Sequence, residues 1–218
     1  MKIGIVGSGR IGSGAARMFA RAGHEVMLSG SRDPASYDSL AEELGGEVGT
    51  PAEAVAFGDV FVFAVPWRTV DDVVPTLGPL DGKIVIDTTN QFGAGGVEDL
   101  VGRTAAQVNA QRLDGARYTK SFNTLTSGFQ AEASARTGAD KVALFLCGDD
   151  AEAKQVVSGL IADAGFVPVD GGGTAGAAPM EAPRRDGAVY GEEYREPDAR
   201  EAGEAMREGR PVPPPPQY

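Results

Sequence analysis

Short apolar runs alternate along this chain with stretches in which apolar residues recur at every third or fourth position. The runs predict buried strands, and the recurring positions predict helices with one buried face. Strands are predicted at 1–6, 25–29, 47–48, 59–65, 83–87, 116–120, 141–147 and 166–169. Helices are predicted from Ile11 to Ala22, at 37–44, from Pro51 and at 150–164, and one intervening helix without defined bounds is predicted before the strands at 116–120 and 141–147. This order predicts an α/β fold of the Rossmann type, a doubly wound and mainly parallel sheet with the run at 59–65 near its middle.

The pattern changes at Gly171. Residues 1–170 form one predicted domain, whereas 171–218 are rich in glycine and proline and show little apolar periodicity. We expect a loop-rich C-terminal arm here. One short helix is predicted at 197–208, because Pro197 suits a first turn and Gly209 follows the end.

Composition narrows the classes of function. The chain has 218 residues, of which 42% are hydrophobic and 23% charged, and its net charge is -11. Nucleic acids and anionic membranes require a basic surface, so small molecules are the expected partners. No leader and no apolar run of ~20 residues is present, which predicts a cytoplasmic protein. With one cysteine, Cys147, and one histidine, His24, we expect no disulfide and no metal site.

A glycine motif, Gly7-Ser8-Gly9-Arg10-Ile11-Gly12, stands between the first predicted strand and the first predicted helix. This is the context in which such a motif binds the pyrophosphate of a dinucleotide. Gly7 permits the tight turn, Gly9 lets the backbone approach the pyrophosphate, and Gly12 lets helix and strand pack closely. The helix N-terminus supplies amide donors. The alternative is a glycine turn that binds nothing.

The end of the second predicted strand distinguishes the two nicotinamide cofactors. An NAD site carries an acidic residue here for the ribose 2′-hydroxyl, but this chain has Ser29-Gly30-Ser31-Arg32. Ser31 and the backbone can donate hydrogen bonds to a 2′-phosphate, and Arg32 can pair with it. We therefore predict NADP(H) as the cofactor, with Ser29, Ser31 and Arg32 at its phosphate. The alternative is that Arg32 is a solvated charge and Asp33 caps the next helix.

Ligands of open α/β sheets bind beyond the carboxyl ends of the strands. Trp67, Asn90 and Asn123 each follow a predicted strand. We predict Trp67 as an aromatic wall of the substrate pocket. Asn90 is predicted to bind the nicotinamide carboxamide, and Asn123 an acceptor carbonyl. The alternatives are a packing role for Trp67 and local Asx turns for the two asparagines.

Four motifs resemble one family. They are the glycine motif, Ser29-Gly30-Ser31-Arg32, Ala64-Val65-Pro66-Trp67 and Cys147-Gly148-Asp149-Asp150-Ala151-Glu152-Ala153-Lys154. Over 1–170 the chain is similar to NADPH-dependent reductases of the deazaflavin coenzyme F-420. The resemblance implies that Ser31 and Arg32 hold the 2′-phosphate. It also implies that the turn at Val65-Pro66-Trp67, with Ala64 before it, lies beside the nicotinamide.

The resemblance implies hydride transfer between NADPH and a deazaflavin. No catalytic acid or base is predicted, because transfer between two stacked ring systems depends mainly on positioning. A flavin, a quinone or a small carbonyl compound stays open as the acceptor, as does a non-catalytic NADP-binding regulator. Arg184, Arg185 and Arg195 are predicted as a basic patch for the phosphate and glutamate tail of the deazaflavin, or alternatively as solvated loop charges.

The arm also carries scattered apolar and aromatic side chains, namely Met180, Val189, Tyr190, Tyr194, Met206 and Tyr218. The arm is too polar to form a core of its own, so we expect these side chains to dock across a partner subunit near the acceptor. Twofold homodimers are the commonest soluble assembly. The alternative is a mobile tail on a monomer.

Overall fold

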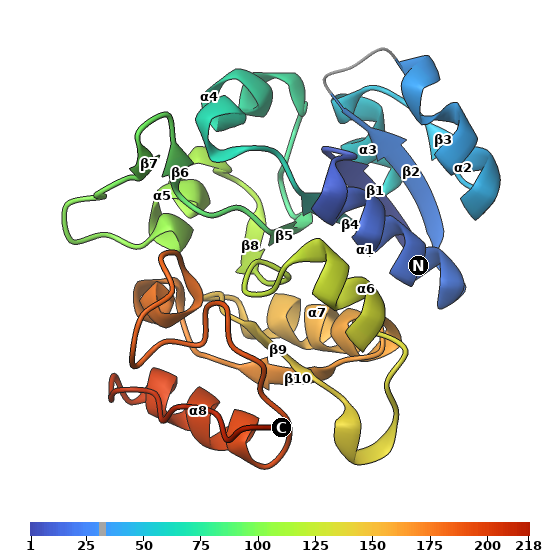
Figure 1. Ribbon diagram of the computed structural model, residues 1–218. Helices are drawn as coiled ribbons and strands as arrows, with labels where there is room; N and C mark the ends of the chain where they lie inside the picture. The colour runs from blue at the N-terminus through green and yellow to red at the C-terminus, as the bar shows by residue number, and fades with distance from the viewer. Residues whose placement is uncertain (31–33) are drawn as a thin grey trace.

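A six-stranded parallel sheet lies at the centre of the N-terminal part of the molecule (Figure 1). The structure is a computed structural model that describes residues 1–30 and 34–218. The strand order is β3-β2-β1-β4-β5-β8, and each pairing is parallel. These strands are β1 (Lys2–Val6), β2 (Glu25–Ser29), β3 (Glu47–Val48), β4 (Val60–Phe63), β5 (Ile84–Asp87) and β8 (Arg117–Lys120). The predicted fold class is confirmed.

Helices cover both faces of the sheet because strand residues alternate between two apolar cores. In β4, Val60 and Val62 belong to the first core, and Phe61 and Phe63 to the second. Helices α1, α2, α6 and α7 contribute to the first core, and α3, α4, α5 and α8 to the second. The helices are α1 (Arg10–Arg21), α2 (Asp38–Leu44), α3 (Pro51–Phe57), α4 (Val70–Val73), α5 (Ala105–Arg112), α6 (Ser127–Ala133), α7 (Ala151–Asp163) and α8 (Asp198–Arg207), with 3-10 helices η1 (Pro34–Tyr37), η2 (Trp67–Thr69), η3 (Val74–Thr76), η4 (Gly138–Asp140), η5 (Thr174–Gly176) and η6 (Ala178–Met180).

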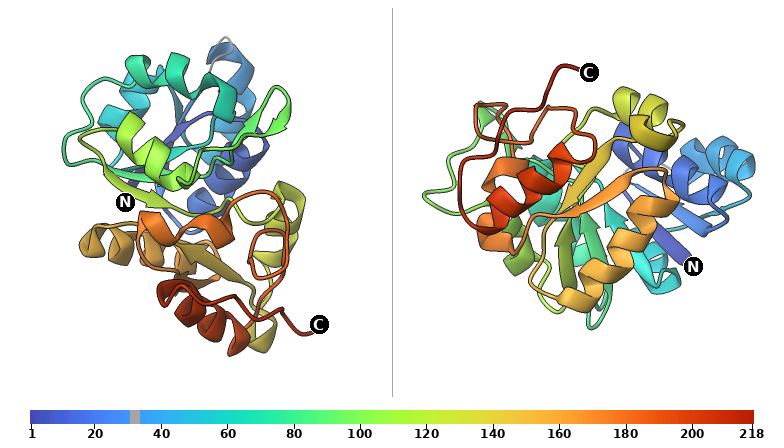
Figure 2. Two further views of the ribbon diagram at one scale, coloured as in Figure 1. Left: turned by 90° about the vertical axis from the view of Figure 1, so that its left-hand side faces the viewer. Right: turned by 90° about the horizontal axis from the view of Figure 1, so that it is seen from below.

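The last two predicted strands form a sheet of their own. β9 (Ala143–Leu146) and β10 (Val167–Asp170) pair in parallel, and one antiparallel bridge between Lys120 and Cys147 joins them to β8. Leu144 and Leu146 face the core that α7 shares, whereas Ala143 and Phe145 face the core that α8 shares. The pair is therefore sandwiched between α7 and α8 (Figure 2).

The pattern along the chain gave no bounds for a short hairpin and three helices. The hairpin, β6 (Phe92–Gly93) and β7 (Gly96–Val97), has strands too short to show an alternating pattern. The three helices are α4, α5 and α6. The start of α5 does carry a capping box between Thr104 and Gln107, which is a sequence signal that could have found it.

The C-terminal arm is packed onto its own chain. The predicted helix is present as α8, and Met180, Val189, Tyr194 and Met206 are all buried in the second core. The ring of Tyr194 meets that of Phe145 edge-on at 5.5 Å. The expectation that these side chains need a partner subunit to bury them was wrong. The arm covers a face of β9 and β10 that would otherwise be exposed, so it completes a core instead of forming one.

Across residues 1–30 and 34–218, none of the helices combines the length and the apolar character that a membrane span requires.

Candidate functional site

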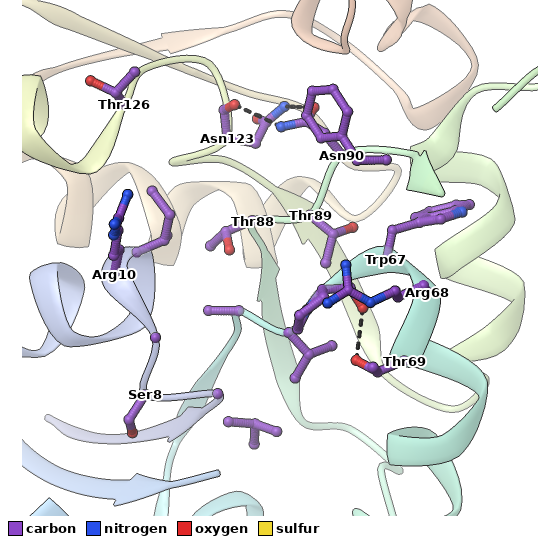
Figure 3. A pocket seen from close by; sticks show the side chains of 18 of the residues that line it. Ser8, Arg10, Trp67, Arg68, Thr69, Thr88, Thr89, Asn90, Asn123 and Thr126 are labelled. Carbon is purple, nitrogen blue, oxygen red and sulfur yellow. Dashed lines mark hydrogen bonds between the residues drawn. The ribbon is translucent and has the colours of Figure 1, made fainter. Parts of the chain in front are cut away.

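A cleft of about 1420 Å³ opens beyond the carboxyl ends of the strands (Figure 3). It lies at the ends of the neighbouring strands β1 and β4. The strand order reverses at this point, because the chain continues from β1 to β2 on one side and from β4 to β5 on the other. The residues that line it are Val6, Gly7, Ser8, Gly9, Arg10, Ile11, Gly30, Tyr37, Pro51, Ala64, Val65, Pro66, Trp67, Arg68, Thr69, Asp72, Val73, Thr76, Thr88, Thr89, Asn90, Phe92, Asn123, Thr124, Leu125, Thr126, Phe129, Arg184, Tyr190, Gly191 and Glu193. Most of the predicted site residues are therefore brought together.

The glycine motif forms the turn from β1 into α1. Gly7 has a φ of +99°, which favours glycine, and the amides of Gly7 and Ser8 both donate to the Ser29 carbonyl at 3.0 Å. A Cβ on Gly9 would meet nothing within 4 Å, so this position faces open space. A Cβ on Gly12 would collide with the Gly7 carbonyl, and Gly12 lies under the turn instead of in the cleft. Gly7 therefore allows the tight turn, Gly9 leaves room for a ligand, and Gly12 allows the helix to pack closely under the turn.

The start of α1 is open. Gly9 is its N-cap residue, and no side chain of the described residues caps it. Helices α3, α5, α6 and α7 each have a threonine or aspartate side chain at this position. The first amides of α1 are therefore available to an anion, together with the positive end of the helix dipole.

The predicted phosphate pocket at the end of β2 is described in part. Ser29 is buried and does not line the cleft; its carbonyl also accepts the Ser8 hydroxyl at 2.9 Å. Its own Oγ has no partner among the described residues. Ser31 and Arg32 lie outside the described residues, so their contact with a 2′-phosphate stays a prediction.

Trp67 is held within the cleft wall. Its indole Nε1 donates to Glu98 at 2.7 Å, and the Arg112 guanidinium lies 4.6 Å from the ring centroid. The side chain is only 4% exposed. This geometry matches the packing alternative, and contact with an acceptor stays a prediction. Ala64, Val65 and Pro66 precede Trp67 along the same wall.

Asn90 and Asn123 lie side by side on the cleft wall and bond each other (Figure 3). The Asn90 amide donates to the Asn123 carbonyl at 2.9 Å, and the Asn123 amide donates to Asn90 Oδ1 at 3.1 Å and to the Met180 carbonyl at 2.6 Å. Phe122, just before Asn123, has a φ of +58°, a conformation that aromatic residues rarely adopt. The pair is thus held by the fold, and its role in binding stays a prediction.

A buried polar network lies behind the cleft floor, and the sequence analysis missed it. Asp87 ends β5 and accepts the Tyr118 hydroxyl at 2.5 Å, the Asn109 amide at 3.0 Å and Thr89 N at 2.8 Å. Lys120 donates to the Thr89 carbonyl at 2.6 Å and lies 3.5 Å from Asp87. Burial raises the pKa of Tyr118 well above its ordinary value, and the negative charge of Asp87 raises it further. The network fixes the backbone of Thr89, which lines the cleft.

Residues of the C-terminal arm line one side of the cleft, called the far wall below, namely Arg184, Tyr190, Gly191 and Glu193. Gly191 N donates to the Thr124 carbonyl at 2.8 Å, which fixes Tyr190 beside the loop after β8. Leu125 and Phe129 line the same end from the start of α6. The sequence analysis missed these wall residues because they come from two segments far apart along the chain and share no local motif.

The three arginines of the arm do not form one patch, so that prediction was wrong. Arg184 lines the cleft but forms an ion pair with Glu192. Arg185 donates to backbone carbonyls, including that of Pro183 at 2.9 Å. Arg195 pairs with Asp140 and Glu193 in a different surface groove. Each guanidinium is thus held by its own acceptors, and of these three arginines only Arg184 lines the cleft.

Residues 2–91, which include the glycine motif, β4 and β5, match the family of NADP oxidoreductases described as coenzyme F420-dependent. The segment that carries the glycine turn is therefore similar to NADP-linked oxidoreductases, in agreement with the predicted resemblance. The match ends before the segments that form the far wall of the cleft, so it leaves the acceptor open.

Solved structures and one curated relative extend the comparison. A hypothetical protein from Sinorhizobium meliloti, SMa0349, is 30% identical, with 90% of this chain and 95% of that chain covered and a TM-score of 0.80. A candidate F420-dependent NADP reductase from Arthrobacter sp. FB24 shares the fold at 24% identity, with 82% and 87% covered and a TM-score of 0.71. The rat metalloreductase STEAP3 is 32% identical over 182 residues, 83% of this chain and 36% of its own length. The chain thus spans about a third of that relative.

Proposed function

We propose that this chain binds NADPH in the cleft and transfers a hydride between it and the deazaflavin coenzyme F-420 or a similar flat redox acceptor. The size of the cleft is the observation that carries the proposal. At about 1420 Å³ it exceeds the roughly 300–1,000 Å³ of a pocket for one small ligand. Two ligands that react with each other need such a shared space.

The two ends of the cleft differ in chemistry. The end near β1 presents the open start of α1 and the uncovered Gly9, which suit a pyrophosphate. The part of the cleft lined by β6, α6 and the arm presents the side chains of Phe92, Phe129 and Tyr190. Aromatic side chains favour stacked or edge-on contact with flat rings. The proposal therefore places the dinucleotide phosphates at the first end and the acceptor ring at the second.

The side chains of the cleft suit hydride transfer by positioning. Among the described lining residues, the side chains that could exchange a proton are Asp72, Glu193, Tyr37 and Tyr190, and Glu193 is engaged by Arg136 and Arg195. When bound, the nicotinamide supplies the hydride, and the protein has to hold two rings face to face. The turn at Gly7 orients the phosphates, the floor at Thr88 and Thr89 supports the nicotinamide, and the far wall excludes water.

The test of the acceptor is stopped-flow absorbance of the protein with NADPH against oxidised coenzyme F-420, FMN, FAD and quinones. We expect single-turnover oxidation of NADPH to be fastest with the deazaflavin. Faster oxidation with a flavin or a quinone would identify that compound as the acceptor instead. Tight NADPH binding without oxidation by any acceptor would support the non-catalytic regulator.

The preference for NADPH is tested at Arg32. Only NADPH presents a 2′-phosphate, so Arg32→Ala is expected to weaken NADPH binding and to leave NADH binding nearly unchanged. Charge-assisted hydrogen bonds contribute ~1.5 to 3 kcal/mol each, so the loss of two corresponds to a preference of about a hundredfold or more. Titration by nucleotide fluorescence measures both affinities, and equal losses would contradict the assignment.

A further inference from the structure

Two exposed arginines in the cleft have no hydrogen-bond or ion-pair partner among the residues that the structure describes. Arg10 is the first residue of α1, and Arg68 lies in η2 directly after Trp67. Neither guanidinium forms a hydrogen bond or an ion pair with any residue that the structure describes. Arg184, the other arginine of the lining, is held by Glu192.

The two guanidiniums belong to opposite walls. Figure 3 shows Arg10 at the start of α1 on one side, and Arg68 reaching from the η2 side toward the open centre. Ser8 and Gly9 precede Arg10 along the chain, Pro66 and Trp67 precede Arg68, and both segments line the cleft. A ligand that follows the glycine turn would therefore have Arg10 on its near side and Arg68 on its far side.

Across residues 1–30 and 34–218, no carboxylate forms an ion pair with either guanidinium. Glu193 lines the cleft but is engaged by Arg136 and Arg195. Asp72 follows Arg68 by four residues, yet no ion pair joins them. In a chain of net charge -11, the cleft thus carries two positive charges that no described carboxylate pairs with.

The geometry points to an anion site between Arg10 and Arg68, in which Arg68 closes over phosphate oxygens that the start of α1 holds from the other side. This inference rests on the proposed function and adds Arg68 to it as a binding residue. Guanidinium groups suit phosphate oxygens because their planar donors match two oxygens at once. The anion is the diphosphate of NADPH or an anionic group of the acceptor.

The experiment compares Arg68→Met, Arg68→Lys and Arg10→Met with Arg200→Met. Arg200 is an exposed arginine of α8 that pairs with Glu196 and does not line the cleft. Binding of NADPH and of inorganic pyrophosphate is measured by calorimetry, and the KM of the acceptor by steady-state kinetics. We expect Arg68→Met to weaken NADPH and pyrophosphate binding about tenfold or more, with Arg68→Lys intermediate and Arg200→Met unchanged.

The outcomes separate the two sources of the anion. Weaker NADPH and pyrophosphate binding with an unchanged acceptor KM identifies the diphosphate. A raised acceptor KM with unchanged NADPH binding identifies an anionic acceptor group. If Arg68→Met changes neither quantity, the anion site is refuted although the proposed function stands. A wild-type protein that binds pyrophosphate but not NADPH would instead contradict the proposed function and leave the anion site supported.

Discussion

At the scale of single residues, Gly9 is the position on which the cofactor proposal depends most directly. A side chain there would enter the cleft without touching the protein, because a Cβ meets nothing within 4 Å. Gly9→Val is therefore expected to abolish NADPH binding while the protein stays folded. Gly14→Ala is the matched control, since a Cβ on this residue of α1 also meets nothing and Gly14 does not line the cleft.

Calorimetric titration and thermal unfolding of both variants check this prediction. The control is expected to bind NADPH normally and to gain about 0.5–1 kcal/mol in helix stability. A folded Gly9→Val protein with undiminished affinity would show that the dinucleotide does not approach the turn.

Cys147 is a residue whose chemistry the fold suppresses. It is fully buried, and burial raises the pKa of its thiol to about 12, compared with about 8.5 for a free cysteine. A raised pKa favours the neutral thiol, which is a poor nucleophile. At about pH 8 we expect a thiol reagent to label the native protein very slowly and the denatured protein at once. Rapid labelling of the native protein would show that this strand opens readily.

At the scale of elements, α5 depends on a residue of the C-terminal arm. The buried carboxylate of Glu181 accepts the amides of Ala105 and Ala106, both at 2.8 Å, and Thr104 donates to the Thr174 carbonyl at 2.8 Å. The arm thus satisfies donors that the first turn of a helix leaves without partners.

Glu181→Gln tests this link. The substitution replaces one acceptor oxygen with a donor that faces buried amides, so we expect a loss of about 1.5–3 kcal/mol in the free energy of unfolding. Urea denaturation measures it, and Glu201→Gln on the exposed face of α8 is the control. Equal stability of the two variants would mean that α5 does not need this carboxylate.

At the scale of the whole molecule, the arm decides whether the fold is complete. Removing the chain after Gly173 would expose Phe145 and Val169, which the arm covers. We expect this truncated protein to aggregate or to lose its cooperative thermal transition. Truncation after Pro213 is the control, because it keeps the buried Val212 and the Pro213 carbonyl that accepts the Tyr194 hydroxyl at 2.6 Å. A cooperative transition at unchanged temperature in the shorter protein would contradict the packing described above.

The homodimer stays a prediction. Burial of the arm within its own chain removes the argument that its side chains need a partner, and what supports a dimer is the frequency of twofold assemblies. Light scattering of the full chain measures the mass directly, and the mass of a monomer would contradict the prediction.

The sequence by itself determined the order and type of most elements and the glycine turn. Periodicity and turn chemistry act between residues a few positions apart, so β1, β2 and the helix at Asp198–Arg207 could be predicted from neighbours alone. The three roles of Gly7, Gly9 and Gly12 follow from the same short span. For this reason the phosphate end of the cleft was predictable.

Only the tertiary structure decided which residues form the far wall, which form the buried network, and where the arm packs. Asp87 meets Tyr118 and Lys120 across neighbouring strands, and Tyr190 reaches the cleft through the backbone bond between Gly191 and Thr124. Such contacts depend on the fit between segments far apart along the chain, which no local pattern records. The polar composition of the arm suggested that it could not enter a core, whereas the few apolar side chains it has were enough to close a core that the rest of the chain had left open.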